Sequence, residues 1–319
     1  MLSGVCKQKG VARAILCRAP ARISFFGGGT DYPQWFERRG GAVLSTTLRK
    51  YCYAVGSTSN EYLERKRELW LPMVGQSQDE QEHTLVAKIL EHLKIPGEFV
   101  LRTGCETKQG SGLGTSAALI VSVLGCVYSL WGINFSRENR ATDAIGLERN
   151  ILRRAVGNQD QIAASHGGLN HITFTREGKS EVRRLAVAAS RIEELQSYLR
   201  IIHTGRTRNS AEIARTYTLE RPESIAALTS ISAMVNRAVE IVGDEDLTAF
   251  GVLLDESWRE KKKLSRFISN DVVDEIYNTA KVEGAIGGKL LGAGRGGFLL
   301  LFAAPSAQER IQRRWDDLG

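Results

Sequence analysis

One short segment constrains the fold of this 319-residue chain more than any other. Residues 109–118 place a glycine at every second position and then two hydroxyls, Thr115 and Ser116, before a long apolar run. Alternating glycines let a backbone approach a ligand closely. A helix that begins here would point its free N–H groups and the positive end of its dipole at the loop. The segment therefore predicts a phosphate-binding turn that leads into a buried helix.

The segment differs from two better-known phosphate-binding patterns. No Gly-Lys-Ser/Thr sequence ends it, which excludes the P-loop. Hydroxyls replace the last glycine of the dinucleotide fingerprint, which makes a nicotinamide or flavin enzyme a weak alternative. A glycine-rich turn that binds nothing remains the competing interpretation.

The composition is that of an ordinary soluble protein, with 42% apolar and 25% charged residues. The chain is long enough for two packed domains. We see no apolar run long enough to cross a bilayer and no signal-peptide pattern, so no membrane partner is expected. The five cysteines are scattered without a Cys-x-x-Cys pair, which fits a reduced, cytoplasmic protein.

The net charge of +7 favours an anionic partner, either nucleic acid or a phosphorylated metabolite. The densest basic stretch, residues 260–263, falls in a predicted amphipathic helix, where a solvated face is the simpler explanation. No basic block is interleaved with aromatic residues. We therefore expect a small-molecule partner and no nucleic acid.

Hydrophobic periodicity predicts a mixed α+β chain in two parts. Strands are expected at 12–26 with a break at Pro20, and at 42–48, 51–55, 99–103, 169–174, 198–203, 285–291 and 298–303. Helices are expected at 83–93, 116–130, 137–156, 159–166, 222–242, 246–264, 270–283 and 306–318. The apolar period is lost at 177–180, which predicts domains at 1–178 and 179–319.

Three separated motifs, at residues 18–32, 110–118 and 289–297, occur in the order typical of one superfamily. In these motifs the chain resembles the GHMP kinases, which include galactokinase, homoserine kinase and mevalonate kinase. The resemblance spans about residues 12–303. It implies an N-terminal ATP-binding domain like domain 2 of ribosomal protein S5, a ferredoxin-like C-terminal domain, and a site between the two.

Within the superfamily the chain is most similar to the heptose 7-phosphate kinases, in segments 27–33, 40–45 and 157–161. Galactokinases carry an acidic residue and a histidine where this chain has Gly28 and Gly29, which argues against galactose. The resemblance implies ATP-dependent phosphorylation of the C1 hydroxyl of D-glycero-D-manno-heptose 7-phosphate, a step toward GDP-heptose. The alternatives are another sugar kinase, of fucose or galactose type, and a catalytically silent sugar-sensing regulator.

A kinase must hold ATP and Mg²⁺ and activate a hydroxyl group. The resemblance implies that the glycine loop binds ATP through Gly110, Ser111, Gly112, Leu113, Gly114, Thr115 and Ser116. It assigns a phosphate contact to Thr115, and Mg²⁺ to Ser116 and Glu148. Helix capping is the competing role of the two hydroxyls, and a helix-surface position is the competing interpretation of Glu148.

The resemblance also implies the catalytic residues. Asp160 would act on the substrate hydroxyl as a base or orienting group, with a late proton transfer because sugar hydroxyls are weak acids. Arg22 would lie near the transferred phosphate and stabilise its charge. From sequence alone, Asp160 is equally placed to interact only with the dipole of its own helix.

Substrate contacts are expected from the remaining loop residues, which are Gly28, Gly29, Thr30, Asp31, Gly292 and Gly294. Asp31 would orient sugar hydroxyls, although an ordinary turn residue fits the same pattern. The distal phosphate needs a cation, and charge and loop position suggest Arg206, Arg208 or Lys289. The oligomeric state is expected to be a monomer or a homodimer.

Overall fold

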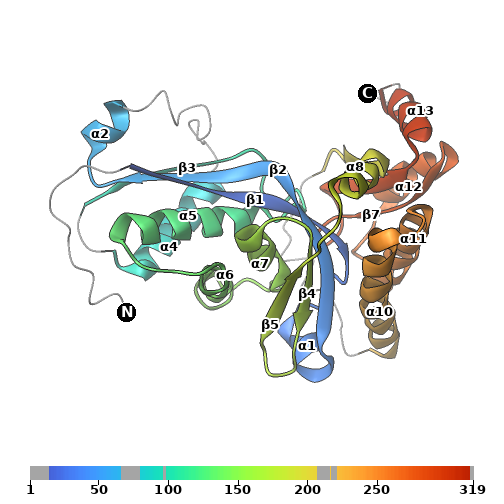
Figure 1. Cartoon of the computed structure of the whole chain (residues 1–319), viewed down its shortest axis with the longest axis horizontal. Coiled ribbons are helices and arrows are strands. Elements are labelled where there is room, and N and C mark those ends of the chain that lie inside the picture. Colours follow the sequence, from blue (N-terminus) through green and yellow to red (C-terminus); the bar gives the residue numbers. More distant parts are fainter. Residues whose placement is uncertain (1–13, 66–79, 96–97, 207–215, 217–220, 317–319) are drawn as a thin grey trace. The chain divides into compact units, whose positions relative to one another are not determined.

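The computed structural model describes the chain except for residues 1–13, 66–79, 96–97, 207–215, 217–220 and 317–319 (Figure 1). Contacts divide it into two compact units, each built from several chain segments. Unit 1 comprises Met1–Arg22, Thr47–Gln109 and Gly114–Gly167, and unit 2 comprises Ile23–Thr46, Gly110–Leu113 and Gly168–Gly319. The units are described one at a time below.

The described residues form a mixed set of strands and helices, which confirms the α+β prediction. The strands are β1 Ala14–Phe26, β2 Gly41–Ser57, β3 Val100–Cys105, β4 Asn170–Phe174, β5 Ser180–Arg184, β6 Leu199–His203, β7 Ala285–Leu290 and β8 Phe298–Ala303. The helices are α1 Pro33–Arg39, α2 Asn60–Arg65, α4 Glu80–Leu93, α5 Thr115–Trp131, α6 Arg137–Gly146, the π-helical turn η1 Leu147–Ile151, α7 Gln159–His166, α8 Ala189–Tyr198, α10 Pro222–Asp244, α11 Thr248–Lys262, α12 Asp271–Val282 and α13 Pro305–Asp316.

Unit 1 is organised around α5, the predicted buried helix. The helix is apolar on all sides and is buried from Ala117 to Tyr128. It packs with α4 along one face of the strands β1, β2 and β3 (Figure 1). Glycines in the left-handed conformation bound it, Gly114 with φ +72° and Gly132 with φ +67°. The glycine loop therefore leads into a deeply buried helix of unit 1.

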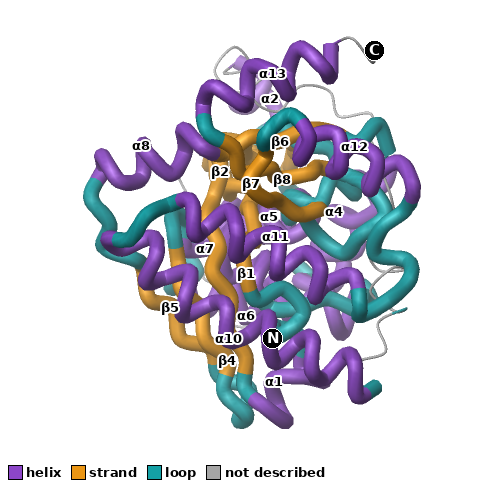
Figure 2. The backbone as a smooth tube through the Cα atoms, turned by 90° about the vertical axis from the view of Figure 1, so that its right-hand side faces the viewer, coloured by secondary structure: helices purple, strands orange, loops and turns teal. Residues whose placement is uncertain are grey.

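Unit 2 contains antiparallel strand pairs and a packed helical layer. The first part of β2 pairs with β4, which pairs with β5, and a second sheet has the order β6-β8-β7. Helices α10 and α11 run side by side (Figures 1 and 2). Helix α11 packs on β7 so closely that a Cβ atom on Gly287 would lie 1.9 Å from the Gly251 carbonyl oxygen. A glycine is required at that crossing.

Several predicted helices and strands differ from those in the structure. Pro20 does not break the first strand, because β1 is an edge strand, where a missing N–H is tolerated. The two strands expected at 42–48 and 51–55 are one strand, β2. The helix expected at 137–156 ends as α6 and η1 at Ile151. Strand β5 and helix α8 were not predicted.

The expectation that no apolar run could cross a bilayer is also wrong by length and composition. Helix α10 has 23 residues and a mean hydropathy of 1.4 over its most apolar window. One face of α10, including Leu228, Ile231 and Val235, is buried against unit 2, while Arg237 and Glu240 stay exposed on the other. The length and mean hydropathy of α10 are thus sufficient for a membrane span, while its arrangement in unit 2 is that of an amphipathic helix with one packed face.

The predicted domain boundary at 178/179 lies in the tight turn between β4 and β5, where Gly178 has φ +81°. These two strands pair with each other, from Asn170 opposite Arg184 to Phe174 opposite Ser180. The loss of apolar period at 177–180 thus marks a hairpin turn. The division into domains 1–178 and 179–319 stays a prediction.

Candidate active site

The two residues expected to be catalytic meet in unit 1, although they lie 138 positions apart in the chain. Arg22 lies in β1 and Asp160 in the first turn of α7. The Arg22 Nε and Nη2 atoms donate to the two carboxylate oxygens of Asp160, both at 2.7 Å. The arginine side chain is 5% exposed and the aspartate side chain 29%. This bidentate pair holds the carboxylate in one orientation and leaves part of it accessible.

Gly114 lies against this pair. Its backbone has φ +72°, and a Cβ atom there would lie 3.1 Å from Arg22 Cγ and 3.4 Å from Asp160 Oδ2. Gly114 is also the N-cap of α5. The end of the glycine loop, a helix N-terminus and the predicted catalytic carboxylate therefore lie together in unit 1.

Ser116 and Glu148, the predicted metal ligands, are also brought together. The Ser116 hydroxyl donates to Glu148 Oε1 at 3.2 Å. Glu148 lies on the π-helical turn η1 and is only 3% exposed, so the helix-surface interpretation is wrong. Burial raises the pKa of Glu148, while the nearby Arg154 guanidinium opposes this shift.

The oxygen atoms of Ser116 and Glu148 are chemically suited to bind Mg²⁺. The ion prefers hard oxygen ligands, and neighbouring ligands in an octahedral shell at ~2.1 Å lie about 3 Å apart. The 3.2 Å separation of Ser116 Oγ and Glu148 Oε1 is close to that spacing. No group of three or more His, Cys, Asp or Glu side chains gathers in the described part of the chain. A Mg²⁺ ion bound with a nucleotide needs only one or two carboxylates, since phosphate and water complete its shell.

Two further side chains complete this cluster. Arg154 Nη1 donates to Ser116 Oγ and lies 3.4 Å from Glu148 Oε1, while Gln161 Nε2 donates to Glu148 Oε2. Sequence reasoning missed both. Gln161 follows Asp160 directly in the segment 157–161 that supported the resemblance, which was a usable signal. Arg154 had none beyond its charge.

The glycine loop is held by backbone contacts and by Thr115. Gly110 and Gly112 have φ +76° and +86°, and the Phe298 amide donates to the Ser111 carbonyl at 3.0 Å. The Thr115 hydroxyl lies 2.7 Å from that of Thr107 and donates to the Lys108 carbonyl at 3.2 Å.

The capping interpretation is wrong for Thr115 and Ser116, because the N-cap position of α5 is Gly114. The phosphate contact of Thr115 stays a prediction.

The turn at residues 28–31, which is expected to contact sugar, is held by hydrogen bonds within unit 2. Thr30 Oγ1 lies 2.8 Å from the Gly27 carbonyl and 2.9 Å from the Ala42 carbonyl, and Asp31 Oδ1 accepts from the Gly29 amide at 3.0 Å. Both side chains are buried. This is the turn role considered for Asp31, and the sugar contacts of Gly28, Gly29, Thr30 and Asp31 stay predictions.

The three candidate cations for a distal phosphate have different surroundings. Lys289 is 3% exposed and its Nζ donates to the Phe25 carbonyl at 2.8 Å. Arg206 has an exposed side chain, and its carbonyl accepts from the Gly297 amide at 2.7 Å. Arg208 lies outside the described residues. Of the two described, Arg206 is the one whose side chain is open to an anion.

The loop after β7 is held by a buried lysine that the sequence analysis missed. Lys261 Nζ donates to the carbonyls of Leu290 and Gly292. Gly294 has φ +128°, and a Cβ atom there would lie 2.7 Å from Ile268 Cα. Backbone packing thus explains Gly294, and Gly292 has a left-handed backbone with φ +72°. The substrate contact of both glycines stays a prediction.

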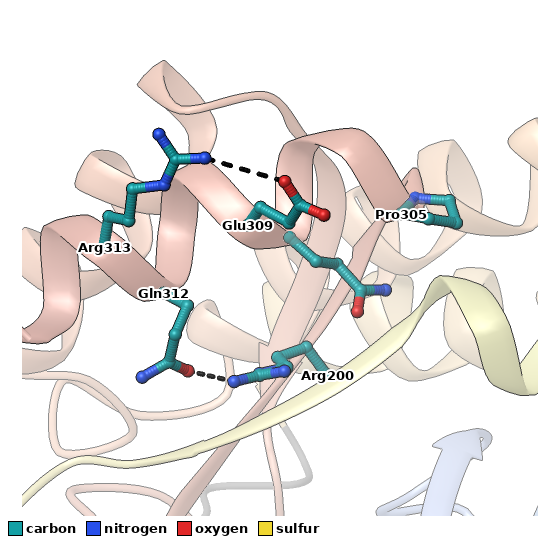
Figure 3. A pocket seen from close by; sticks show the side chains of 6 residues that line it. Arg200, Pro305, Glu309, Gln312 and Arg313 are labelled. Atoms are coloured by element: carbon teal, nitrogen blue, oxygen red, sulfur yellow. Dashed lines mark hydrogen bonds and ion pairs between the residues drawn. The ribbon is translucent and has the colours of Figure 1, made fainter.

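A pocket of about 400 Å³ lies elsewhere in unit 2, between β6 and α13 (Figure 3). Arg200 and Arg313 line it, but the first pairs with Gln312 and the second with Glu309. None of the predicted site residues lines this pocket. We assign no function to it.

Comparison with known families agrees with this geometry. The model of the GHMP kinase N-terminal domain matches residues 83–168, and that of the GHMP kinase C-terminal domain matches residues 232–319. The chain belongs to the GHMP kinases, small-molecule kinases that transfer a phosphoryl group from ATP to an alcohol.

Individual kinases are similar to this chain along most of its length. The D-glycero-alpha-D-manno-heptose 7-phosphate kinase of Campylobacter jejuni is 28% identical over 94% of this chain and 92% of its own length. The bifunctional fucokinase/GDP-fucose pyrophosphorylase of Arabidopsis thaliana is also 28% identical, over 92% of this chain but 30% of its own length. A heptose 1-phosphate kinase from Bacteroides thetaiotaomicron has a similar fold, with a TM-score of 0.74, 22% identity, and coverage of 96% of this chain and 93% of its own.

Proposed function

We propose that this chain is an ATP-dependent kinase that phosphorylates the C1 hydroxyl of D-glycero-D-manno-heptose 7-phosphate. The observation that carries the proposal is the Arg22–Asp160 pair, held against Gly114 at the N-terminus of α5. It combines an oriented carboxylate for the hydroxyl with a cation and a helix N-terminus, both of which stabilise phosphate charge. The Campylobacter jejuni relative supports the choice of sugar.

In this mechanism Asp160 accepts the hydroxyl proton late, as the new O–P bond forms, because a sugar hydroxyl is a far weaker acid than a carboxyl group. Arg22 keeps the carboxylate in place through two hydrogen bonds and stabilises charge on the transferred group. The glycine loop and the N–H groups of α5 bind the triphosphate.

We assign Ser116 and Glu148 as the protein ligands of Mg²⁺. When bound, the ion would neutralise charge on the β- and γ-phosphate oxygens. The hydrogen bond from Gln161 holds one carboxylate oxygen of Glu148 and leaves Oε1 directed at Ser116. We also propose a cytoplasmic location and a monomer or homodimer that acts on small molecules alone.

A substrate panel tests the proposal. ADP release with Mg-ATP is measured over D-glycero-D-manno-heptose 7-phosphate, heptose 1-phosphate, unphosphorylated heptose, mannose, fucose and galactose. We expect turnover on the 7-phosphate alone. Turnover on the 1-phosphate or on a plain sugar would keep the kinase class and overturn the acceptor. ATP binding without turnover on any sugar would favour the regulator alternative.

The same assay tests Asp160. We expect Asp160→Asn to lower kcat by about 10²- to 10⁴-fold, the usual contribution of a general base. Asp271→Asn is the matched control, since Asp271 is an exposed aspartate in the first turn of α12. A kcat in Asp160→Asn no lower than in Asp271→Asn would contradict a role of Asp160 in the proton transfer.

A further inference from the structure

Both carboxylate oxygens of Glu148 already have partners, and the partners differ in kind. Oε2 accepts from Gln161, a neutral amide on α7. Oε1 accepts from Ser116 on α5 and lies 3.4 Å from Arg154 Nη1, a cation. The same Arg154 nitrogen also donates to Ser116 Oγ. One positively charged group therefore contacts the two oxygens that would ligate a metal.

Charge balance explains why a cation lies there. A carboxylate that is 3% exposed is costly to keep charged without a partner. Arg154 supplies that partner from residues 152–157, a segment without helix or strand. Its side chain is 31% exposed, so the guanidinium can move into water at little cost. Ser116 and Gln161 are fixed on helices, which makes Arg154 the movable member of the cluster.

We propose that Arg154 takes the place of Mg²⁺ in the metal-free protein and must be displaced when Mg²⁺ and nucleotide bind. A metal ion bonded to Ser116 Oγ and Glu148 Oε1 would need the space next to both oxygens that Nη1 occupies. Arg154 is then a positioning residue that keeps the metal ligands charged and aligned, and sets metal affinity by competition. This inference rests on the proposed role of Ser116 and Glu148.

Direct metal binding tests the inference without relying on turnover. Mn²⁺ replaces Mg²⁺ as a paramagnetic probe, and free Mn²⁺ is measured by electron paramagnetic resonance during titration with saturating ADP. We expect Arg154→Ala and Arg154→Gln to bind Mn²⁺ roughly tenfold more tightly, the scale of one hydrogen bond to a charged group. The glutamine keeps a hydrogen-bond donor but removes the charge, and thermal melting checks that both variants fold.

Two further variants separate the possible outcomes. Arg153→Ala removes an exposed positive charge one residue away, and its Mn²⁺ affinity should equal that of the wild type. Glu148→Gln should weaken Mn²⁺ binding. If Glu148→Gln weakens Mn²⁺ binding but the Arg154 variants bind Mn²⁺ no more tightly than the wild type, the proposed metal site is supported. The proposed competition between Arg154 and the metal is then wrong. If Glu148→Gln has no effect, the proposed metal site fails first.

Discussion

At the scale of single residues, Gly114 shows how one backbone position serves both folding and chemistry. It begins α5 in a left-handed conformation, which glycine adopts without steric cost. It also leaves room for the Arg22 side chain and the Asp160 carboxylate. A side chain at this position would affect the predicted catalytic pair as well as the helix start.

Gly132 offers a matched comparison at the other end of the same helix. Its φ of +67° is similar, but a Cβ atom there would meet nothing within 4 Å. We expect Gly132→Ala to lower the free energy of unfolding by about 1 kcal/mol for the left-handed backbone, and Gly114→Ala by at least as much, because its Cβ atom also presses on Arg22. Only Gly114→Ala should lower kcat, by tenfold or more, since it displaces Arg22 or Asp160. Urea unfolding and ADP release measure the two effects, and an equal kcat in both variants would contradict the prediction.

At the scale of elements, the π-helical turn η1 decides where Glu148 lies. Residues 137–156 have a helical pattern, and an uninterrupted α-helix would continue through Glu148 to Gly157. Instead α6 ends at Gly146, and η1 changes the angular position of the residues that follow. The turn directs Glu148 into the cluster with Ser116 and Gln161.

The hairpin of β4 and β5 carries a prediction about pH. His171 lies opposite Arg183, whose Nη2 is 3.3 Å from His171 Nδ1, and among the described residues the buried His171 Nε2 has no hydrogen-bond partner. Burial, assisted by the charge of Arg183, lowers the pKa of His171. As the pH falls below about 6.5, His171 therefore binds a proton in the unfolded chain before it does so in the folded protein.

The contribution of neutral His171 to stability should accordingly be complete above that pH. It should be lost as the pH falls from the pKa of His171 in the unfolded chain to its lower pKa in the folded protein. His171→Gln should reduce the slope of unfolding free energy against pH between 7 and 5, as measured by urea unfolding. Some slope should remain from His166, whose pKa burial also lowers. An unchanged slope in the variant would count against His171.

At the scale of the whole molecule, some contacts join distant parts of the sequence. Lys289 on β7 bonds the carbonyl of Phe25 near the end of β1, across 264 positions of the chain. Both residues belong to unit 2, which is assembled from three separate chain segments. The contact joins two of these segments, Ile23–Thr46 and Gly168–Gly319.

A basic residue near the predicted site can stabilise the fold or bind the substrate phosphate, and we expect Lys289 to do the first and Arg206 the second. We expect Lys289→Met to lower the free energy of unfolding by about 1–3 kcal/mol, because it removes a buried donor from the Phe25 carbonyl. Arg206→Ala should change it by less than about 0.5 kcal/mol, as an exposed side chain, and should instead raise KM for the 7-phosphorylated sugar. Urea unfolding and steady-state kinetics measure the two. A stable Lys289→Met variant with a raised KM would return Lys289 to the substrate site.

The sequence by itself determined the strongly periodic elements and the family. Helix α5, the long helices of unit 2 and the hairpin of β7 and β8 follow from local apolar patterns. The three motifs sufficed to assign the GHMP kinases. The tertiary structure alone decided which side chains surround Glu148, that Lys289 and Thr30 face inward, and that β1 continues through Pro20. The physical reason is range: periodicity and turn chemistry act within a few residues, whereas hydrogen bonds and burial join residues that only the folded chain brings together.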